Sequence, residues 1–295
     1  MTSPAPFGRM LTAMATAFTD DGAVDLDGTA AIAHHLVEHG HDGVVVSGTT
    51  GESPTCTVAE SGDILRAVKD AVGDRATVIA GVGSNTTAHS IELAQQAEKL
   101  GADALLLVTP YYNKPGQAGV LHHFEQVAGA TGTPVVLYDV PGRTATQITL
   151  ETYERIKGDT VVAVKDAVGD FARGVRLREL GYAVYSGDDL ANLAWLAHGA
   201  CGVISVVGHA AGRPIRSMIE DFLDGNTVAA LKTYQRLLPA TEAIMGVPNY
   251  GATTAKACLQ LLGVLDNRNV RGPLVPLTDD ELAALRAGLE ASQLL

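Results

Sequence analysis

Short apolar runs rich in β-branched residues alternate along this chain with longer stretches in which apolar side chains recur at helical spacing. Each short run is almost continuously apolar, which is typical of parallel strands that are buried on both faces. The pattern therefore predicts eight buried strands. The predicted strands are Met10–Phe18, Gly43–Ser47, Thr77–Gly81, Ala104–Thr109, Pro134–Tyr138, Val161–Lys165, Ala183–Ser186 and Gly202–Val206.

The stretches between these runs predict amphipathic helices. Asp25 is a candidate N-cap for the first of them, and Thr57 followed by Glu60 has the spacing of a capping box. The predicted helices are Leu26–Glu38, Val58–Val72, Ala88–Leu100, Gly116–Thr131, Thr149–Lys157, Phe171–Leu180 and Asp188–His198. Strands that each precede a helix predict an α/β fold, a (β/α)8 barrel. A doubly wound sheet would carry G-x-G-x-x-G after its first strand, and the sequence lacks that turn.

The chain continues beyond the eighth strand with a helical pattern. The helices predicted there are Ile215–Leu223, Thr227–Ile244, Thr253–Leu262 and Asp279–Ser292. One completes the barrel and the others form a C-terminal helical extension. We predict a barrel over residues 1–225 and a helical layer over residues 226–295 that packs on it within one catalytic unit. The turn-rich stretch Asn267–Thr278 is the best candidate for a linker.

The charge of the chain argues against nucleic acid and membranes as binding partners. The 295 residues include 21 Lys and Arg against 33 Asp and Glu, for a net charge of −12. Such an acidic chain is a poor ligand for nucleic acid or an anionic membrane. No run approaches the roughly 18 apolar residues of a membrane span, and residues 1–6 do not resemble a signal peptide. Because Cys56, Cys201 and Cys258 are far apart, we expect free thiols in a cytoplasmic protein.

Histidines are concentrated near the first predicted helix. His35 and His39 have the i, i+4 spacing of metal ligands, but there is no H-E-x-x-H motif. We interpret these two residues, with His34 and His41, as solvated histidines and expect no metal site.

Lys165 is the most informative residue for chemistry. The active site of a (β/α)8 barrel lies at the C-terminal ends of the strands, and Lys165 ends the sixth apolar run. Burial lowers a lysine pKa, and the neutral amine can attack a carbonyl to form a Schiff base. The alternative is a structural lysine that pairs with Asp166 or another nearby carboxylate.

Three further features lie at the same predicted end of the barrel. Tyr138 ends the strand before Lys165 and could transfer protons, or it could simply pack in the core. The turn Gly48-Thr49-Thr50-Gly51 could present backbone N–H groups to a carboxylate, or be an ordinary turn. Arg143 follows Pro141-Gly142 and could bind a carboxylate, or be a surface arginine.

Five motifs occur in a fixed order along the chain. They are G-T-T-G-E at Gly48–Glu52, Y-x-V-P-x-R-T at Tyr138–Thr144, V-K-[DE] at Val164–Asp166, S-G-D-D at Ser186–Asp189 and G-x-I-S-V at Gly202–Val206. Over essentially its whole length the chain resembles the pyruvate-dependent, lysine Schiff-base family of dihydrodipicolinate synthase and N-acetylneuraminate lyase. Arg143 matches the synthases, because the lyases usually carry a Leu-Ser pair at that place.

The resemblance implies a role for each matching residue. Lys165 would form the imine with pyruvate, while Tyr138, Thr50 and Tyr112 would form a proton relay. Tyr112 would come from the neighbouring subunit of a homotetramer built as a dimer of dimers. Arg143 would hold the carboxylate of L-aspartate 4-semialdehyde.

Further roles follow from the same resemblance. Thr49 and Thr50 would bind the pyruvate carboxylate through their N–H groups, Ile204 would offer its carbonyl, and Gly187 would shape the site. The implied reaction joins pyruvate to L-aspartate 4-semialdehyde without a metal or an organic cofactor, giving 4-hydroxy-tetrahydrodipicolinate for lysine and diaminopimelate biosynthesis. The alternatives are another pyruvate aldolase, a keto-sugar-acid dehydratase, and a non-catalytic keto-acid sensor.

The chain departs from the family pattern at several positions. Asp139 stands where Asn is common, Asp166 where Glu is common, and Ala17 where Pro is usual. If Asp139 were close to Tyr138 and charged, it would raise the phenol pKa. The family's feedback site for lysine matches poorly at Val58 and His89, so we expect weak or no inhibition by lysine. The other positions of that feedback site are Ser53, Pro54, Asn85 and Tyr111.

Overall fold

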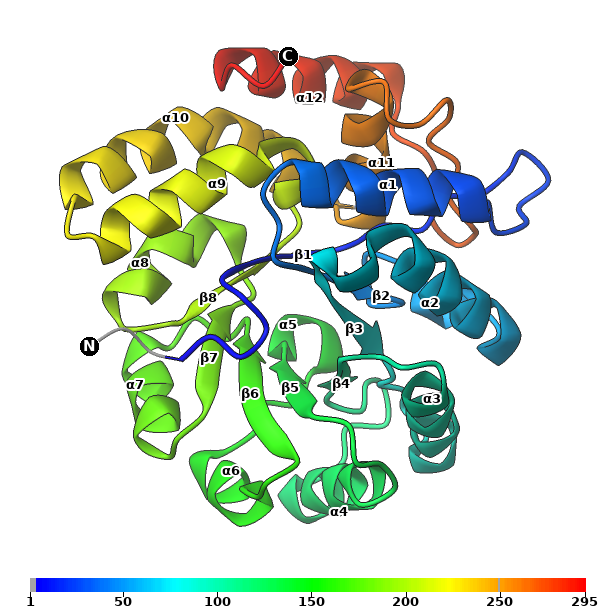
Figure 1. Ribbon diagram of the computed structural model, residues 1–295, viewed down its shortest axis with the longest axis vertical. Coiled ribbons are helices and arrows are strands. Elements are labelled where there is room, and N and C mark those ends of the chain that lie inside the picture. Colours follow the sequence, from blue (N-terminus) through cyan, green and yellow to red (C-terminus); the bar gives the residue numbers. More distant parts are fainter. Residues whose placement is uncertain (1–3, 249) are drawn as a thin grey trace.

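The computed structural model describes residues 4–248 and 250–295, so the first three residues of the N-terminal segment lie outside it. Within these residues eight parallel strands close into a barrel in chain order, and β1 pairs with both β2 and β8. The strands are β1 Met10–Ala13, β2 Gly43–Val46, β3 Thr77–Gly81, β4 Ala104–Val108, β5 Val135–Asp139, β6 Val161–Asp166, β7 Ala183–Ser186 and β8 Gly202–Ser205. Figure 1 shows the ring of helices around these strands, which confirms the (β/α)8 prediction.

Most helices agree with the predicted spans, but α9 begins at Gly208 instead of Ile215. Asp25 caps α1 by accepting from the Gly28 N–H, and Thr57 and Glu60 form the predicted capping box of α2. The helices are α1 Leu26–Glu38, α2 Val58–Val72, α3 Thr87–Lys99, α4 Gln117–Ala128, α5 Pro141–Thr144, α6 Leu150–Ile156, α7 Phe171–Glu179, α8 Asn192–Ala197, α9 Gly208–Leu223, α10 Thr227–Met245, α11 Ala252–Leu261 and α12 Asp279–Ala291.

Two other predicted elements are wrong for identifiable reasons. The first strand ends at Ala13 instead of Phe18, because the apolar residues that follow pack in a loop at the barrel mouth and leave the ladder. Phe18 makes only an isolated bridge to Val24. The single helix expected over Asp188–His198 is divided into a 3-10 turn and α8, since the Asp188 side chain accepts from the Leu190 N–H and starts the shorter turn.

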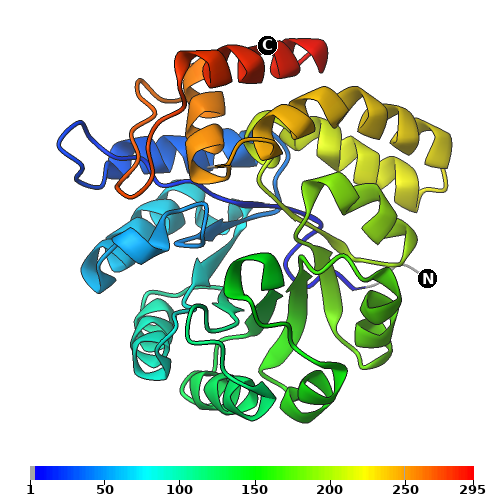
Figure 2. The same ribbon diagram turned by 180° about the vertical axis from the view of Figure 1, so that it is seen from behind.

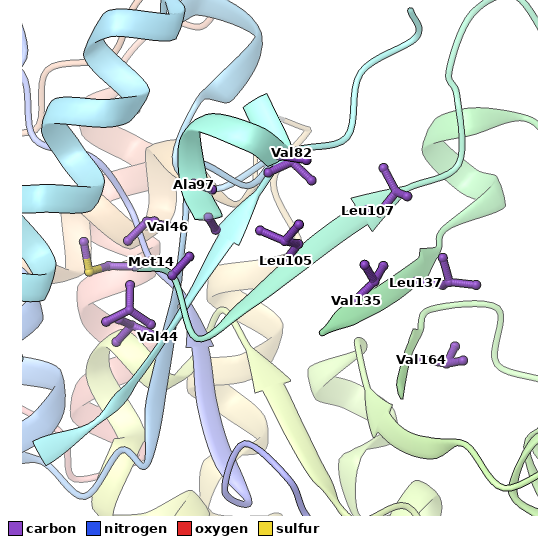
Figure 3. Packing of buried hydrophobic residues seen from close by; sticks show 14 of the residues in the cluster. Met14, Val44, Val46, Val82, Ala97, Leu105, Leu107, Val135, Leu137 and Val164 are labelled. Atoms are coloured by element: carbon purple, nitrogen blue, oxygen red, sulfur yellow. The ribbon is translucent and has the colours of Figure 1, made fainter. Parts of the chain in front are cut away.

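Side chains of the strands alternate between two apolar clusters. Val136 and Ala163 belong to the cluster inside the barrel, whereas Leu137 and Val164 belong to the cluster between the strands and the helices. Figure 3 shows part of the outer cluster, including both of these residues. Because the period of a strand is two residues, the alternation sets which strand-end side chains face inward.

The C-terminal helices cover one side of the barrel. α10 packs on α9, and α12 packs on α10 (Figure 2). A third apolar cluster joins Met10 of β1 and Val203 of β8 to Leu237 of α10, Cys258 of α11 and Leu285 of α12. The extension therefore shares a core with the barrel. Among the described residues, no helix is long and apolar enough to cross a membrane.

The expectation of solvated histidines is wrong for His41. Its side chain is only 4% exposed, Nδ1 lies 2.7 Å from the Leu36 carbonyl oxygen, and Nε2 lies 2.8 Å from Thr12 Oγ1. Burial lowers the pKa of His41 to about 3. His35 is also partly buried and contacts the His209 carbonyl at 2.9 Å. α1 directs His35 toward His209 of α9, and the turn after α1 places the His41 ring against Gly212 of the same helix. Local sequence does not reveal this packing.

Candidate active site

A cavity of about 470 Å³ opens at the C-terminal ends of the strands. Its wall combines the ends of β5 and β6, the turns after β2 and β7, and part of the C-terminal extension. Six residues predicted for the site line it together, namely Thr49, Thr50, Tyr138, Arg143, Lys165 and Gly187.

Lys165 lies inside the barrel with its Nζ 4.5 Å from the centroid of the Tyr138 ring. Its side chain is buried and makes no ion pair with any residue in the described part of the chain. Burial lowers the pKa of Lys165 to about 8; the Asp189 carboxylate opposes this shift, and the Arg143 guanidinium adds to it. The alternative in which Lys165 pairs with Asp166 is wrong, because Asp166 points out of the barrel and pairs with Arg173.

Tyr138 is a buried phenol beside this amine. Burial raises its pKa to about 12, while the Arg143 guanidinium lowers it and nearby Asp188 raises it further. The expected contribution of Asp139 is wrong. That carboxylate follows Tyr138 in β5, so it faces the opposite side of the strand and pairs with Arg173.

Gly187 provides the space in which Lys165 lies. A Cβ at this position would come within 3.0 Å of Lys165 Cγ and 3.1 Å of its Cε. Any other residue at this position would force the lysine stem to move. The geometry thus gives a steric reason for the glycine in the turn after β7.

The same turn also supports the end of β8. Asp189 is buried and accepts hydrogen bonds from the N–H groups of Val206 at 2.7 Å and Val207 at 3.0 Å. Ile204 lies two residues earlier than Val206, and its side chain belongs to the cluster inside the barrel. Ile204 does not line the cavity itself.

The loop that carries Thr49 and Thr50 is held from two sides. Thr16 Oγ1 donates to the Gly51 carbonyl at 2.9 Å. On the other side, the Glu52 carboxylate binds Lys256 Nζ of α11 at 2.5 Å and accepts from the Arg271 N–H at 2.9 Å. Glu52 itself has a left-handed backbone with φ of 56°.

Arg143 lies on the short helix α5 at the exposed edge of the cavity. Its guanidinium carbon is 5.0 Å from the centroid of the Tyr250 ring. Tyr250 and Met245 line the cavity but were not predicted. No local signal marks them, because they reach the cavity only through the packing of α10 and α11 on the barrel.

Tyr112, like Ile204, is a predicted site residue that does not line the cavity of Lys165. Its side chain is 89% exposed, and its φ is 73°. It lines a neighbouring cavity of about 390 Å³, which also contains Tyr111, Ser53 and Pro54. The two cavities share Tyr138 and Arg143 as a common wall, along with four other residues.

Fold and site together define a (β/α)8 barrel in which a buried lysine at the end of a strand lines the cavity at the barrel mouth. The chain belongs to the dihydrodipicolinate synthetase family, whose model matches residues 6–292, and this confirms the resemblance found in the sequence.

Individual relatives match this chain over nearly its whole length. The chain is 55% identical over 286 residues to the 4-hydroxy-tetrahydrodipicolinate synthase of Kineococcus radiotolerans, which is 96% of this chain and 92% of that protein. It is also 55% identical to the enzyme of the same name from Acidothermus cellulolyticus, over 98% of this chain and 94% of that protein. A crystal structure of DHDPS from Cyanidioschyzon merolae with lysine bound has a TM-score of 0.94 and 40% identity, over 98% of this chain and 99% of that one.

Proposed function

We propose that this chain is a 4-hydroxy-tetrahydrodipicolinate synthase, which condenses pyruvate with L-aspartate 4-semialdehyde in lysine and diaminopimelate biosynthesis. The observation that carries the proposal is Lys165. It is a buried amine that has no counter-ion among the described residues, it has a pKa lowered to about 8, and it lines a cavity that Arg143 borders. Relatives at 55% identity bear the name of this activity.

The chemistry begins at the amine. Neutral Lys165 attacks the ketone carbon of pyruvate, the ketone oxygen takes up protons and leaves as water, and a protonated imine forms. This electron sink acidifies the methyl group, whose deprotonation gives an enamine. The enamine carbon attacks the aldehyde carbon of the second substrate, and the aldehyde oxygen is protonated to a hydroxyl. The amino group of that substrate then attacks the imine carbon, which closes the ring and releases Lys165.

Proton transfer is the role we assign to Tyr138, Thr50 and Tyr112. Tyr138 is next to the amine, and its raised pKa of about 12 keeps the phenol protonated and able to donate. The exposed Tyr112 would complete the relay in the site of a second copy of this chain. This shared relay requires at least a dimer, and on the family resemblance we propose a homotetramer, a dimer of dimers.

Substrate binding follows from the remaining residues. The N–H groups of Thr49 and Thr50 would receive the pyruvate carboxylate, and Arg143 would pair with the carboxylate of the semialdehyde. Ile204 would contribute its carbonyl, and Gly187 leaves room for the lysine stem. We further propose a cytoplasmic enzyme with no metal or organic cofactor and weak inhibition by lysine.

The first experiment supplies pyruvate and L-aspartate 4-semialdehyde and follows product reduction by added dihydrodipicolinate reductase and NADPH. Turnover should require both substrates and disappear in Lys165→Ala, which can form no imine. Lys232→Ala, which alters an exposed lysine of α10, is the matched control and should retain full activity.

Each result has a clear consequence. Substantial turnover by Lys165→Ala would refute the mechanism. If the wild-type protein forms a pyruvate imine but does not consume the semialdehyde, the substrate assignment fails and another pyruvate aldolase or a keto-acid sensor replaces it.

A further inference from the structure

Behind Lys165 and Tyr138 lie two acidic side chains that the proposed reaction does not use. In the ladder between β5 and β6, Tyr138 pairs with Lys165 and the following Asp139 pairs with Asp166. Tyr138 and Lys165 face the cavity, so the two aspartates, one position further along, face the surrounding helices. Arg173 of α7 reaches both of them.

Arg173 contacts the ends of β5 and β6 through different terminal nitrogens. One terminal nitrogen donates to Asp166 Oδ2 at 2.6 Å, and the other donates to Asp139 Oδ2 and to the Ile148 carbonyl, the latter at 2.9 Å. The guanidinium also lies 5.2 Å from the centroid of the Tyr153 ring. We call Asp139, Asp166 and Arg173 the Arg173 cluster.

The backbone around the cluster is tied to the same carboxylates. Asp166 Oδ1 accepts from the Val168 N–H at 2.8 Å, and Asp139 Oδ2 accepts from the Ile148 N–H at 3.2 Å. Both carboxylates are fully buried, and the arginine side chain is only 6% exposed. A buried planar guanidinium that binds two carboxylates sets their separation with little freedom.

We infer that Arg173 is a positioning residue for the Lys165–Tyr138 pair, acting through the carboxylates that follow these two residues in β5 and β6. The inference rests on the proposed function. Each aspartate is covalently adjacent to a site residue, so a change in the spacing of the aspartates moves the amine relative to the phenol. The arrangement also keeps the strand ends closed, and this closure maintains the burial that favours the neutral amine of Lys165.

The test compares Arg173→Lys with Arg176→Lys. Lysine keeps the positive charge, but its compact ammonium does not reproduce the planar bonding of both carboxylates. Arg176 is on the same helix, is 68% exposed and pairs with Glu179, so it is the matched control. The measured quantity is the rate at which borohydride traps the imine with pyruvate alone, over a range of pH, together with the melting temperature.

For Arg173→Lys we expect a trapping rate at neutral pH that is roughly tenfold lower, a change of about 1.4 kcal/mol in barrier. The apparent pKa of the amine should rise from about 8 toward its ordinary value as water enters. The charged and titratable groups that face Lys165 among the described residues are unchanged in the variant; they are Asp188, Asp189, Arg143, Tyr138 and Tyr250. Arg176→Lys should match the wild-type protein in rate and pH profile.

A folded Arg173→Lys with unchanged rate and pH profile would overturn the inference, whatever its melting temperature, because Arg173 would then be only structural. If Arg173→Lys does not fold, Asp166→Asn takes its place, with an expected loss of at least about threefold in trapping rate. Unchanged trapping by that variant would equally overturn the inference. Since only pyruvate is used, failure of the semialdehyde assignment does not affect this comparison, whereas a wild-type protein that traps no pyruvate refutes the proposed function itself.

Discussion

Two ion clusters support the cavity, each with a buried cation–carboxylate contact, and they differ in the elements they connect and in their charge balance. In the Arg173 cluster, one cation serves two carboxylates on adjacent strands. In the second, which we call the Lys256 cluster, Lys256 of α11 binds Glu52 in the loop after β2, and Arg271 binds Glu60 of α2. The first cluster connects neighbours within the barrel. The second connects the barrel to its C-terminal extension across 204 positions of sequence.

The two clusters differ in how completely their carboxylates are paired and hydrogen-bonded. This difference predicts which cluster is more sensitive to a substitution and which to pH. Both oxygens of Glu52 have partners, since Lys256 takes one and the Arg271 N–H takes the other. Asp139 is less completely hydrogen-bonded, because its buried Oδ1 has no hydrogen-bond partner in the part of the chain that the structure describes. Burial accordingly raises the pKa of Asp139 to about 6, despite the nearby guanidinium of Arg173. The Lys256 cluster should therefore respond most to loss of a partner, and the Arg173 cluster to pH.

Lys256→Met should have the largest effect on stability. The variant leaves the fully buried Glu52 carboxylate without its cation, at a cost of about 3–5 kcal/mol in the free energy of unfolding. Urea unfolding at a fixed protein concentration measures the loss. Because Glu52 adjoins the Thr49–Thr50 loop, the KM for pyruvate should also rise several-fold.

Two further variants make that result interpretable. Lys232→Met alters an exposed lysine and should change stability by less than about 0.5 kcal/mol. Glu52→Gln combined with Lys256→Met removes both charges and should recover part of the loss. A Lys256→Met protein as stable as the wild type would show that the buried ion pair contributes nothing to the fold.

Asp139→Asn should have a smaller, pH-dependent effect. A pKa raised to about 6 in the folded state, above 3.8 for the free group, means that the folded protein binds the proton more tightly. The resulting stability is present below pH 3.8 and is lost as the pH rises through 6. Between pH 4.5 and 7.5 the wild type should therefore lose about 2 kcal/mol relative to Asp139→Asn.

Urea unfolding of the two proteins at both pH values measures this difference. The buried histidines His41, His123 and His209 also have lowered pKa values, but they are the same in both proteins and cancel. A stability difference that is the same at pH 4.5 and 7.5 would mean that Asp139 stays ionised in the folded protein over this whole range.

The same contrast explains what the sequence could predict. Strand periodicity and a lysine at the end of an apolar run are local signals, and they sufficed for the barrel and for the position of Lys165. They also place Tyr138 on the inward face. The error about Asp139 came from treating adjacency in sequence as proximity in space, although successive strand residues face opposite sides.

Long-range packing was beyond local sequence reasoning. Neither the partner of Glu52 nor the approach of Tyr250 to Arg143 has a local signature, because both depend on how the C-terminal helices lie across the barrel. His41 was misjudged for the same reason, since its burial depends on contacts with other elements. The roles assigned to Thr49, Thr50, Tyr112 and Ile204 remain predictions for experiment.

Arg271→Met should have the smallest effect on stability. It should also show whether the Arg271–Glu60 pair and the Lys256–Glu52 pair of the Lys256 cluster act independently. The Arg271 guanidinium binds Glu60 at 2.6 Å and the Thr55 carbonyl at 2.9 Å and lies 4.4 Å from the Phe18 ring, but its side chain is 18% exposed. Partial solvation limits the expected loss to about 1–2 kcal/mol. Arg286→Met, which alters an exposed pair on α12, should cost less than about 0.5 kcal/mol.

The pH dependence of the Arg271→Met effect has a defined sign. Arg271 lowers the pKa of Glu60 to about 2, so this pair stabilises the fold above pH 4.5 and loses that contribution as the pH falls toward 2. The difference in the free energy of unfolding between wild type and variant should therefore become smaller in acid.

Amide hydrogen exchange should be faster in residues 267–278 of the variant, while the Lys256–Glu52 contact keeps the Thr49–Thr50 loop protected. If exchange in that loop increases equally, the two ion pairs act as a single unit and the distinction between them is wrong.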